Sequence, residues 1–198
     1  MNWCTYMVSC RKRAADREAT LRSLAASDWG QAPVVVLDDE QAPTTVKRIA
    51  RTWTRVMMMA TRCDAGASSD RAEDMILMME DDVRFTPRLR SIVEQWSALK
   101  ARGVLFFGSL YDNLPSFYPN AGVDYAVCPP DLFWGFQAIV SNRQTLAAVL
   151  HLTTVCETHI DVCVGGSLSK LTPIYVHRPG LVTHVGVSTR DRYIGIDA

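Results

Sequence analysis

The sequence lacks a long hydrophobic run and an excess of charge of either sign. Its apolar start, MNWCTYMVSC, is followed at once by charged residues, whereas a membrane-spanning helix needs about 20 apolar residues. Lysine plus arginine equals aspartate plus glutamate at 21 each, so the net charge gives no general attraction to nucleic acid or to an anionic membrane. We expect neither a signal peptide nor a membrane anchor. The expected location is the cytoplasm, or the host cytoplasm for a chain of phage origin.

Closely spaced cysteine pairs, internal repeats and polar low-complexity tracts are also absent. The six cysteines form no CxxC pair, which argues against a zinc site or a disulfide framework and predicts reduced thiols used as small core residues. A chain of 198 residues, 48% of them hydrophobic, is long enough to bury a core of its own. We therefore predict one folded domain.

Predicted strands and helices alternate along the chain. Strands are predicted at residues 5–9, 34–37, 75–79, 104–107, 136–140 and 174–176, and helices at 14–26, 45–62, 88–100, 143–150 and 161–171. The segment 111–130 is rich in proline, asparagine and aromatic residues and predicts one long loop. Such alternation is typical of an α/β fold in which helices flank a mixed, mostly parallel sheet.

Three consecutive acids, Glu80, Asp81 and Asp82, follow the unbroken apolar run 75–79. That run predicts a central strand covered on both faces. Carboxylates placed directly after it lose solvation and repel one another unless a positive charge lies nearby. In an extended chain Glu80 and Asp82 share a face, and carboxylate oxygens are the ligands that Mg²⁺ and Mn²⁺ prefer. The pattern favours a divalent metal site over a solvated turn, because open α/β sheets bind ligands at the carboxyl ends of their strands.

The order of these segments resembles the glycosyltransferases of the GT-A fold, especially those whose metal motif reads EDD after an apolar strand. The segments that carry the resemblance are TYMVSCRKRAADREATLRSL, VVVLDD, MILMMEDDV, FWGFQAIVSN, THIDVCVG and PIYVHRPGLVTHVGVS. The resemblance implies a single glycosyltransferase domain with a GT-A-like fold. Residues 1–82 would form its nucleotide-donor half, and residues 83–198 its acceptor half and metal-binding tail.

The same resemblance implies a role for each acid of the triplet and for one histidine. Asp82 would be the direct metal ligand, Glu80 would hydrogen-bond the donor ribose, and Asp81 would touch the donor sugar. His184 lies in the segment THVGVS, which resembles a segment whose histidine contacts the metal or the diphosphate. A purely structural role is the alternative for His184.

Two further pairs of residues are expected near the nucleotide. Asp38 or Asp39, at the end of the second strand, matches an acid that reads the uracil ring in the family. Arg11 or Arg17, after the first strand, matches a basic residue near the nucleotide. The sequence does not decide between the members of either pair.

Asp161 is the expected catalytic base. An inverting sugar transfer needs a carboxylate on the acceptor side that takes the proton of the incoming hydroxyl, and Asp161 lies in the segment THIDVCVG. The alternative is a helix N-cap, a position that aspartate serves well, and Glu157 is the substitute candidate. Trp134, Gly135 and Phe136 would shape a sugar pocket or belong to the core.

The resemblance thus implies a hexosyl-type glycosyltransferase that uses Mn²⁺ or Mg²⁺ and a nucleotide sugar, with a UDP-sugar as the expected donor. The acceptor is open among a glycan, a protein, a small molecule and a modified base in phage DNA, and the neutral charge does not favour DNA. A sugar-phosphate nucleotidyltransferase is one alternative, although no glycine accompanies the basic turn 11–13 where such enzymes usually have a glycine-rich loop. A catalytically inactive nucleotide-binding module is the other.

Overall fold

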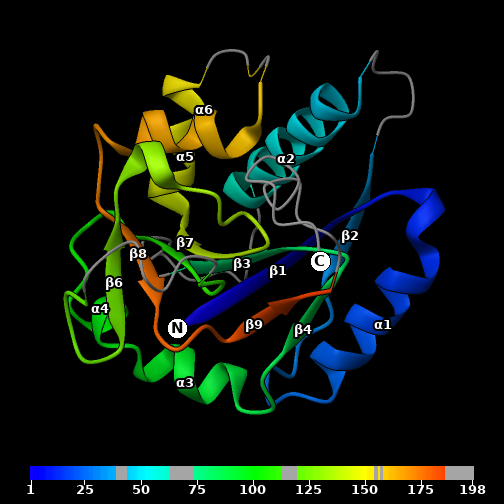
Figure 1. Cartoon of the computed structure of the whole chain (residues 1–198), viewed down its shortest axis with the longest axis horizontal. Helices are drawn as coiled ribbons and strands as arrows, with labels where there is room; N and C mark the ends of the chain where they lie inside the picture. The colour runs from blue at the N-terminus through cyan, green and yellow to red at the C-terminus, as the bar shows by residue number, and fades with distance from the viewer. Residues whose placement is uncertain (39–43, 63–73, 113–119, 154–155, 157, 186–198) are drawn as a thin grey trace, which may run out of the picture.

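Seven strands form one sheet in the residues that the computed structural model describes, namely 1–38, 44–62, 74–112, 120–153, 156 and 158–185. The strands are β1 (Asn2–Ser9), β2 (Val34–Leu37), β3 (Asp74–Glu80), β5 (Phe107–Ser109), β6 (Tyr125–Cys128), β7 (Ala138–Asn142) and β8 (Ile174–His177). They lie in the order β2-β1-β3-β7-β5-β8-β6, and five run in one direction while β7 and β6 run in the other (Figure 1). The predicted α/β fold with a mixed, mostly parallel sheet is confirmed.

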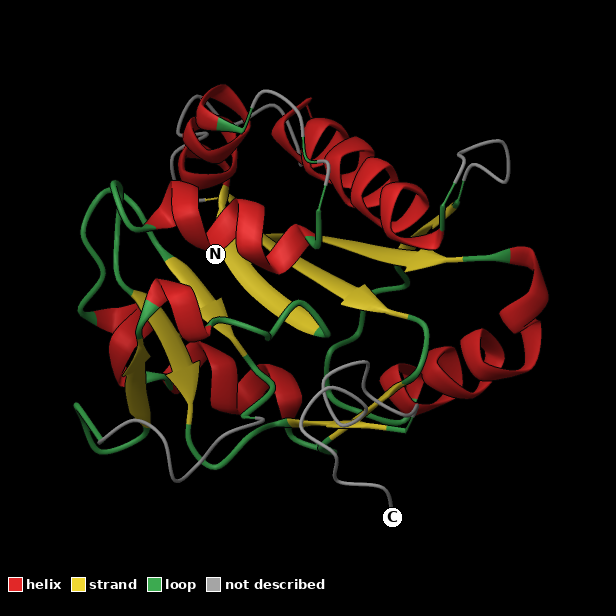
Figure 2. Cartoon of the chain, turned by 45° about the horizontal axis from the view of Figure 1, so that its top comes forward, coloured by secondary structure: helices red, strands yellow, loops and turns green. Residues whose placement is uncertain are grey.

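Helices cover both faces of this sheet. They are α1 (Ala14–Ala25), α2 (Thr45–Arg62), α3 (Leu89–Gln95), α4 (Ser97–Lys100), α5 (Arg143–Leu152) and α6 (Ile160–Leu168). Figures 1 and 2 show α2, α5 and α6 on one face and α1, α3 and α4 on the other. Among the described helices, none combines the length and the apolar character that crossing a membrane requires.

The central strand β3 supplies side chains to the cores on both faces. Ile76 and Met78 pack on the α2 side, whereas Met75, Leu77 and Met79 pack on the α1 side. All five side chains are fully buried, as the unbroken apolar run predicts, because alternate residues of a strand face opposite sides. At roughly 1.5 to 3 kcal/mol for each buried large side chain, this strand fixes the position of the acids that follow it.

The helix predicted over residues 88–100 is broken at Trp96. This residue has φ −53° and ψ 122°, which separates α3 from α4. The Trp96 ring is fully buried, packs edge-on against Phe106 at 5.5 Å between ring centroids, and fills the space that a Cβ on Gly108 would need. Burial of this large ring outweighs the local preference for a continuous helix.

Strand pairing corrects several other boundaries. The strand predicted at 104–107 is β5, which begins only at Phe107, and the segment predicted as one loop over 111–130 contains β6. The strand β2, predicted to be buried, is an edge strand, so Val34 remains 49% exposed. A second, two-stranded sheet joins β4 (Val83–Phe85) to β9 (Val182–His184) in antiparallel fashion. The sequence pattern predicts neither of these short strands.

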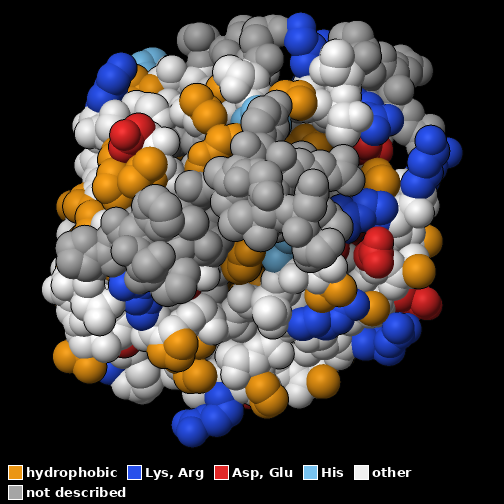
Figure 3. Space-filling view, in the orientation of Figure 1, with side chains coloured by type: hydrophobic (Ala, Val, Ile, Leu, Met, Phe, Trp, Pro, Cys, Tyr) orange, Lys and Arg blue, Asp and Glu red, His pale blue; other side chains and the backbone are white. Residues whose placement is uncertain are grey.

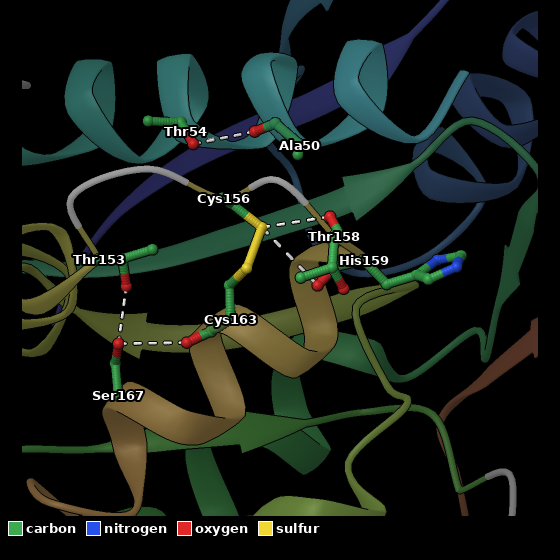
Figure 4. The surroundings of a disulfide bond; sticks show 8 residues. All are labelled: Ala50, Thr54, Thr153, Cys156, Thr158, His159, Cys163 and Ser167. Atoms are coloured by element: carbon green, nitrogen blue, oxygen red, sulfur yellow. Dashed lines mark hydrogen bonds between the residues drawn. A yellow bond between two sulfur atoms is a disulfide. The ribbon is translucent and has the colours of Figure 1, made fainter. Parts of the chain in front are cut away.

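The prediction of six reduced cysteines is wrong for two of them. Cys156 and Cys163 form a disulfide, with their Cα atoms 5.9 Å apart, which ties Cys156 to the helix α6 (Figure 4). Cys4 and Cys128 are free and buried, as expected, and Cys10 is free and partly exposed. Cys63 lies outside the described residues.

Candidate active site

A pocket lies at the edge of the sheet where the carboxyl ends of β1, β2 and β3 meet. These three strands are mutually parallel, so their ends share one edge. The pocket has a volume of about 240 Å³, and its polar lining residues are Ser9, Arg13, Asp38, Thr45, Arg48, Glu80 and Asp81. It therefore brings together the acids at the ends of the second and third strands, which are far apart in the sequence.

Glu80, Asp82 and His184 form a group of possible metal ligands beside this pocket. One ligand atom from each residue lies within 4.8 Å of the others. Glu80 ends β3, Asp82 lies in the turn before β4, and the pairing of β4 with β9 puts His184 opposite Val83. Glu80 and Asp82 thus lie together as predicted, although a turn rather than an extended strand brings them there.

This donor set fits a hard divalent cation. Carboxylate oxygens suit Mg²⁺ and Mn²⁺, and an imidazole nitrogen is a ligand that transition metals accept. Asp82 Oδ1 is buried and has no hydrogen-bond partner among the described residues. A buried anionic oxygen without a partner is costly, and a bound cation would satisfy it.

Two neighbouring side chains, those of His184 and Arg13, favour the charged form of Asp82. The Asp82 Oδ2 atom accepts hydrogen bonds from His184 Nε2 at 2.9 Å and from the Arg13 guanidinium. Burial alone would raise the pKa of Asp82, but the hydrogen bonds and charges of His184 and Arg13 outweigh it and lower this pKa. Burial lowers the pKa of His184, and the bond to Asp82 outweighs it, so that this pKa is raised.

Glu80 and Asp161 are acids whose pKa values are raised. Burial, followed by the charges of Asp82 and Asp161, raises the pKa of Glu80 to about 8. Burial raises the pKa of Asp161 to about 6, although its carboxylate accepts the backbone N–H of Phe136 at 3.1 Å. The charge of Asp161 is thus one of the causes of the raised pKa of Glu80.

The N-cap alternative for Asp161 is wrong. The helix α6 begins at Ile160, and its N-cap is His159. The Asp161 carboxylate instead binds the backbone just before β7, at Phe136. Glu157, the substitute candidate, lies outside the described residues.

Asp81 points toward β1 and the turn that follows it. Ser9 Oγ donates a hydrogen bond to Asp81 Oδ2 at 2.7 Å, and Arg13 Nη1 lies 3.0 Å from Asp81 Oδ1. Thr20 Oγ1 on α1 donates to the Asp81 carbonyl at 2.7 Å. Burial raises the pKa of Asp81, with the bonds from Ser9 and Arg13 acting against it. Asp81 lines the pocket, and its contact with a donor sugar stays a prediction.

The arginine that reaches the acids is Arg13, which the sequence argument did not include in the site. Arg17 donates to Ser9 Oγ at 2.9 Å and to the Cys10 carbonyl at 3.0 Å, so it supports the end of β1. Arg11 is exposed at the start of the 3-10 helix η1 (Arg11–Arg13). Only the packing of η1 against the turn after β3 distinguishes Arg13 from its neighbours.

Asp38 lies at the pocket beside Arg48 of α2. Arg48 Nε is 3.6 Å from Asp38 Oδ2, and the Asp38 side chain is only 8% exposed. Asp38 Oδ1 and Arg48 Nε are buried without hydrogen-bond partners among the described residues. Arg48 therefore belongs to the pocket lining. Asp39 lies outside the described residues.

The aromatic segment before β7 has one ring in the core and one that is partly exposed. Phe136 is buried and packs edge-on against Trp53 at 4.8 Å between ring centroids. The Trp134 ring is partly exposed, and its centroid lies 5.4 Å from that of the His159 ring.

His177 is buried, and its Nδ1 lies 2.8 Å from the Pro179 carbonyl oxygen.

Other basic residues near the site lie on exposed helix faces. Figure 3 shows lysine and arginine side chains at the side of the molecule formed by α1, with acidic side chains among them. Arg22 and Glu18 of α1 pair at 3.6 Å with side chains 70% and 74% exposed. Exposed pairs of this kind contribute little stability, as expected for solvated faces.

In sequence, the chain matches no protein-family model and no curated protein. In structure, it is similar to a glycosyltransferase involved in the glycosylation of the major capsid of PBCV-1, with a TM-score of 0.53 and 10% identity over 98% of this chain and 100% of that one. An inositol-1-phosphate CTP transferase from T. maritima matches with a TM-score of 0.46 and 11% identity over 98% and 76% of the two chains. That second likeness is too distant to carry an argument. The first establishes a shared fold.

Proposed function

We propose that the chain is a divalent-metal-dependent glycosyltransferase that moves a sugar from a nucleotide sugar, a UDP-sugar, to an acceptor hydroxyl. The observation that carries this proposal is the group Glu80, Asp82 and His184 at the edge of a pocket that also contains Asp38. An acidic metal site next to a pocket at the carboxyl edge of an α/β sheet is what a metal-bridged diphosphate requires. The fold shared with a glycosyltransferase supports the same assignment.

The donor half comprises residues 1–82 together with His184. Asp82 and His184 hold the cation, and Glu80 adjoins it and contacts the donor ribose from the pocket wall. When bound, the metal stabilises the negative charge that accumulates on the leaving diphosphate. Asp81 faces the donor sugar.

The nucleobase lies against Asp38 and Arg48. The free Asp38 Oδ1 is an acceptor and Arg48 Nε is a donor, and the two groups are neighbours in the pocket wall. A uracil ring presents an N–H beside a carbonyl oxygen, which matches this pair. Arg17 acts through Ser9 and Cys10, which it fixes by hydrogen bonds.

Asp161 is the catalytic base on the acceptor side, within residues 83–198. Its pKa of about 6 leaves it ionised at neutral pH and still basic enough to take a proton from a hydroxyl during attack. Trp134 is partly exposed, with its ring 5.4 Å from that of His159, and an aromatic face of this kind stacks on a sugar ring.

Thermal unfolding with UDP, in Mn²⁺ and in EDTA, tests the donor site. We expect UDP to raise the melting temperature much more with Mn²⁺, because only a ligand that binds the folded state stabilises it. Equal shifts in EDTA would contradict the metal-dependent site. A hydrolysis screen over nucleotide sugars with Mn²⁺ then tests transfer chemistry. UDP binding without sugar release from any donor would identify an inactive binding module, and turnover of UTP with a sugar phosphate would identify a nucleotidyltransferase.

A further inference from the structure

Arg13, which follows β1, contacts two of the three consecutive acids at the end of β3. Its Nη1 lies 3.0 Å from Asp81 Oδ1, and its Nη2 donates a hydrogen bond to Asp82 Oδ2. Arg13 belongs to η1, which follows β1, so these contacts tie the ends of β1 and β3 together. A planar guanidinium suits two neighbouring carboxylates better than a lysine ammonium does.

The oxygen that Arg13 binds is the one that His184 also contacts. His184 Nε2 lies 2.9 Å from the same Asp82 Oδ2, and both residues belong to the possible metal-ligand group. The Arg13 guanidinium therefore adjoins the position that a divalent cation would take. Two cations that close repel each other, so Arg13 and the metal compete for the charge of Asp82.

Arg13 is also the more exposed partner in these contacts. Its side chain is 37% exposed, whereas those of Asp81 and Asp82 are 3% and 7% exposed. The acids are fixed by the core beneath them, and the arginine lies at the rim. Because Arg13 lines the pocket together with Asp38 and Arg48, an anion bound in that pocket would be its next partner.

We propose that Arg13 is the built-in counter-cation of the acidic site. It holds Asp81 and Asp82 in place in the metal-free protein and releases Asp82 to the divalent cation. It then contacts the diphosphate of the donor, a step that rests on the proposed function. Arg13 thus opposes binding of the metal alone and favours binding of the nucleotide with the metal.

Calorimetric titration of Arg13→Met and the wild-type chain tests these opposite effects. We expect Mn²⁺ alone to bind Arg13→Met roughly tenfold more tightly, because the competing charge is gone. UDP at saturating Mn²⁺ should bind roughly tenfold more weakly, on the scale of one lost charge-assisted hydrogen bond. Arg22→Met is the matched control, because it removes an exposed arginine that pairs with Glu18 along α1, and it should bind both ligands like the wild type.

Mn²⁺ affinity that is unchanged or lower in Arg13→Met would overturn the inference while leaving the metal site intact. A wild-type chain that binds neither Mn²⁺ nor UDP would overturn the proposed function and this inference with it. For the case in which Arg13→Met does not fold, the Nε–H resonance of Arg13 in the wild-type chain provides the readout. It should shift on addition of Mg²⁺, and a resonance that does not respond excludes displacement.

Discussion

His184 Nε2 lies 2.9 Å from Asp82 Oδ2, and this contact joins two segments that are 102 residues apart in the chain. It forms because β9 pairs with β4, which puts His184 opposite Val83, the residue after Asp82. The backbone N–H of Val185 also donates to the Asp82 carbonyl at 2.8 Å. The candidate metal site therefore depends on the small two-stranded sheet as well as on the central strand.

Asp82→Asn should weaken metal-dependent UDP binding sharply and reduce transfer by about 10² to 10³, the scale of losing one preorganised electrostatic contact. If repulsion among Glu80, Asp81 and Asp82 acted alone, the metal-free Asp82→Asn variant would be more stable than the wild type. The structure predicts the reverse, because His184 and Arg13 outweigh burial and lower the pKa of Asp82. Charged Asp82 thus stabilises the fold above its unfolded pKa, and this contribution disappears as pH falls through the lower folded pKa.

The measurement for Asp82→Asn is thermal unfolding in EDTA at pH 7 and pH 3, with calorimetry of Mn²⁺ and UDP. The variant should melt below the wild type at pH 7, and the difference should shrink at pH 3, which is below the ordinary pKa of an aspartate. Wild-type binding of Mn²⁺ and UDP by this variant would remove Asp82 from the metal site.

His184→Gln should lower Mn²⁺ affinity by at least roughly tenfold, the smallest effect usual for groups around a bound metal. His151→Gln is the matched control, because His151 is exposed in the last turn of α5 and should not affect binding. Titration of Mn²⁺ into both variants checks this. Equal affinities would assign His184 a structural role only.

Asp161→Asn should retain UDP binding, and its rate of sugar transfer should fall by a factor of roughly 10² or more, the usual scale for loss of a general base. In the wild type, kcat/KM should rise with pH through about 6, the raised pKa of the buried Asp161, because only the ionised carboxylate accepts a proton. Asp131→Asn provides the control, since Asp131 is an exposed acid in the 3-10 helix η3 (Pro130–Leu132). Wild-type turnover by Asp161→Asn would exclude Asp161 as the base.

Two adjacent glycines of α6 should respond oppositely to alanine. A Cβ on Gly165 would lie 2.6 Å from the Pro130 carbonyl oxygen, whereas a Cβ on Gly166 would have no neighbour within 4 Å. Gly165→Ala should lower the free energy of unfolding by about 1 to 3 kcal/mol and reduce transfer, because α6 carries Asp161. Gly166→Ala should raise the free energy of unfolding by roughly 0.5 to 1 kcal/mol. Urea unfolding measures both, and similar values for the two variants would show that α6 does not pack closely against η3.

The disulfide between Cys156 and Cys163 should contribute about 2 to 3 kcal/mol to stability, as expected for a short closed loop. It connects residues seven positions apart on either side of Asp161. A reducing agent should therefore destabilise the wild type and have no further effect on Cys163→Ser. Titration of free thiols under denaturing conditions checks whether the bond is present, and equal sensitivity of both proteins to the reductant would contradict its stabilising role.

The sequence by itself determined the features that depend on local pattern. The apolar run that became β3 places Glu80 at the end of a central strand, because five consecutive apolar residues require cover on both faces. The helix α2 occupies the predicted residues. The α/β class followed from the alternation of such elements.

Only the tertiary structure decided which distant side chains meet. The selection of Arg13 over Arg11, the pairing that brings His184 to Asp82, and the place of Arg48 in the pocket all depend on contacts between elements. The strands β4 and β9 are three residues each, too short for periodicity to reveal, and they exist because they pair with each other. The break at Trp96 has the same origin, since burial of one ring against distant partners outweighs the propensity of the residues around it.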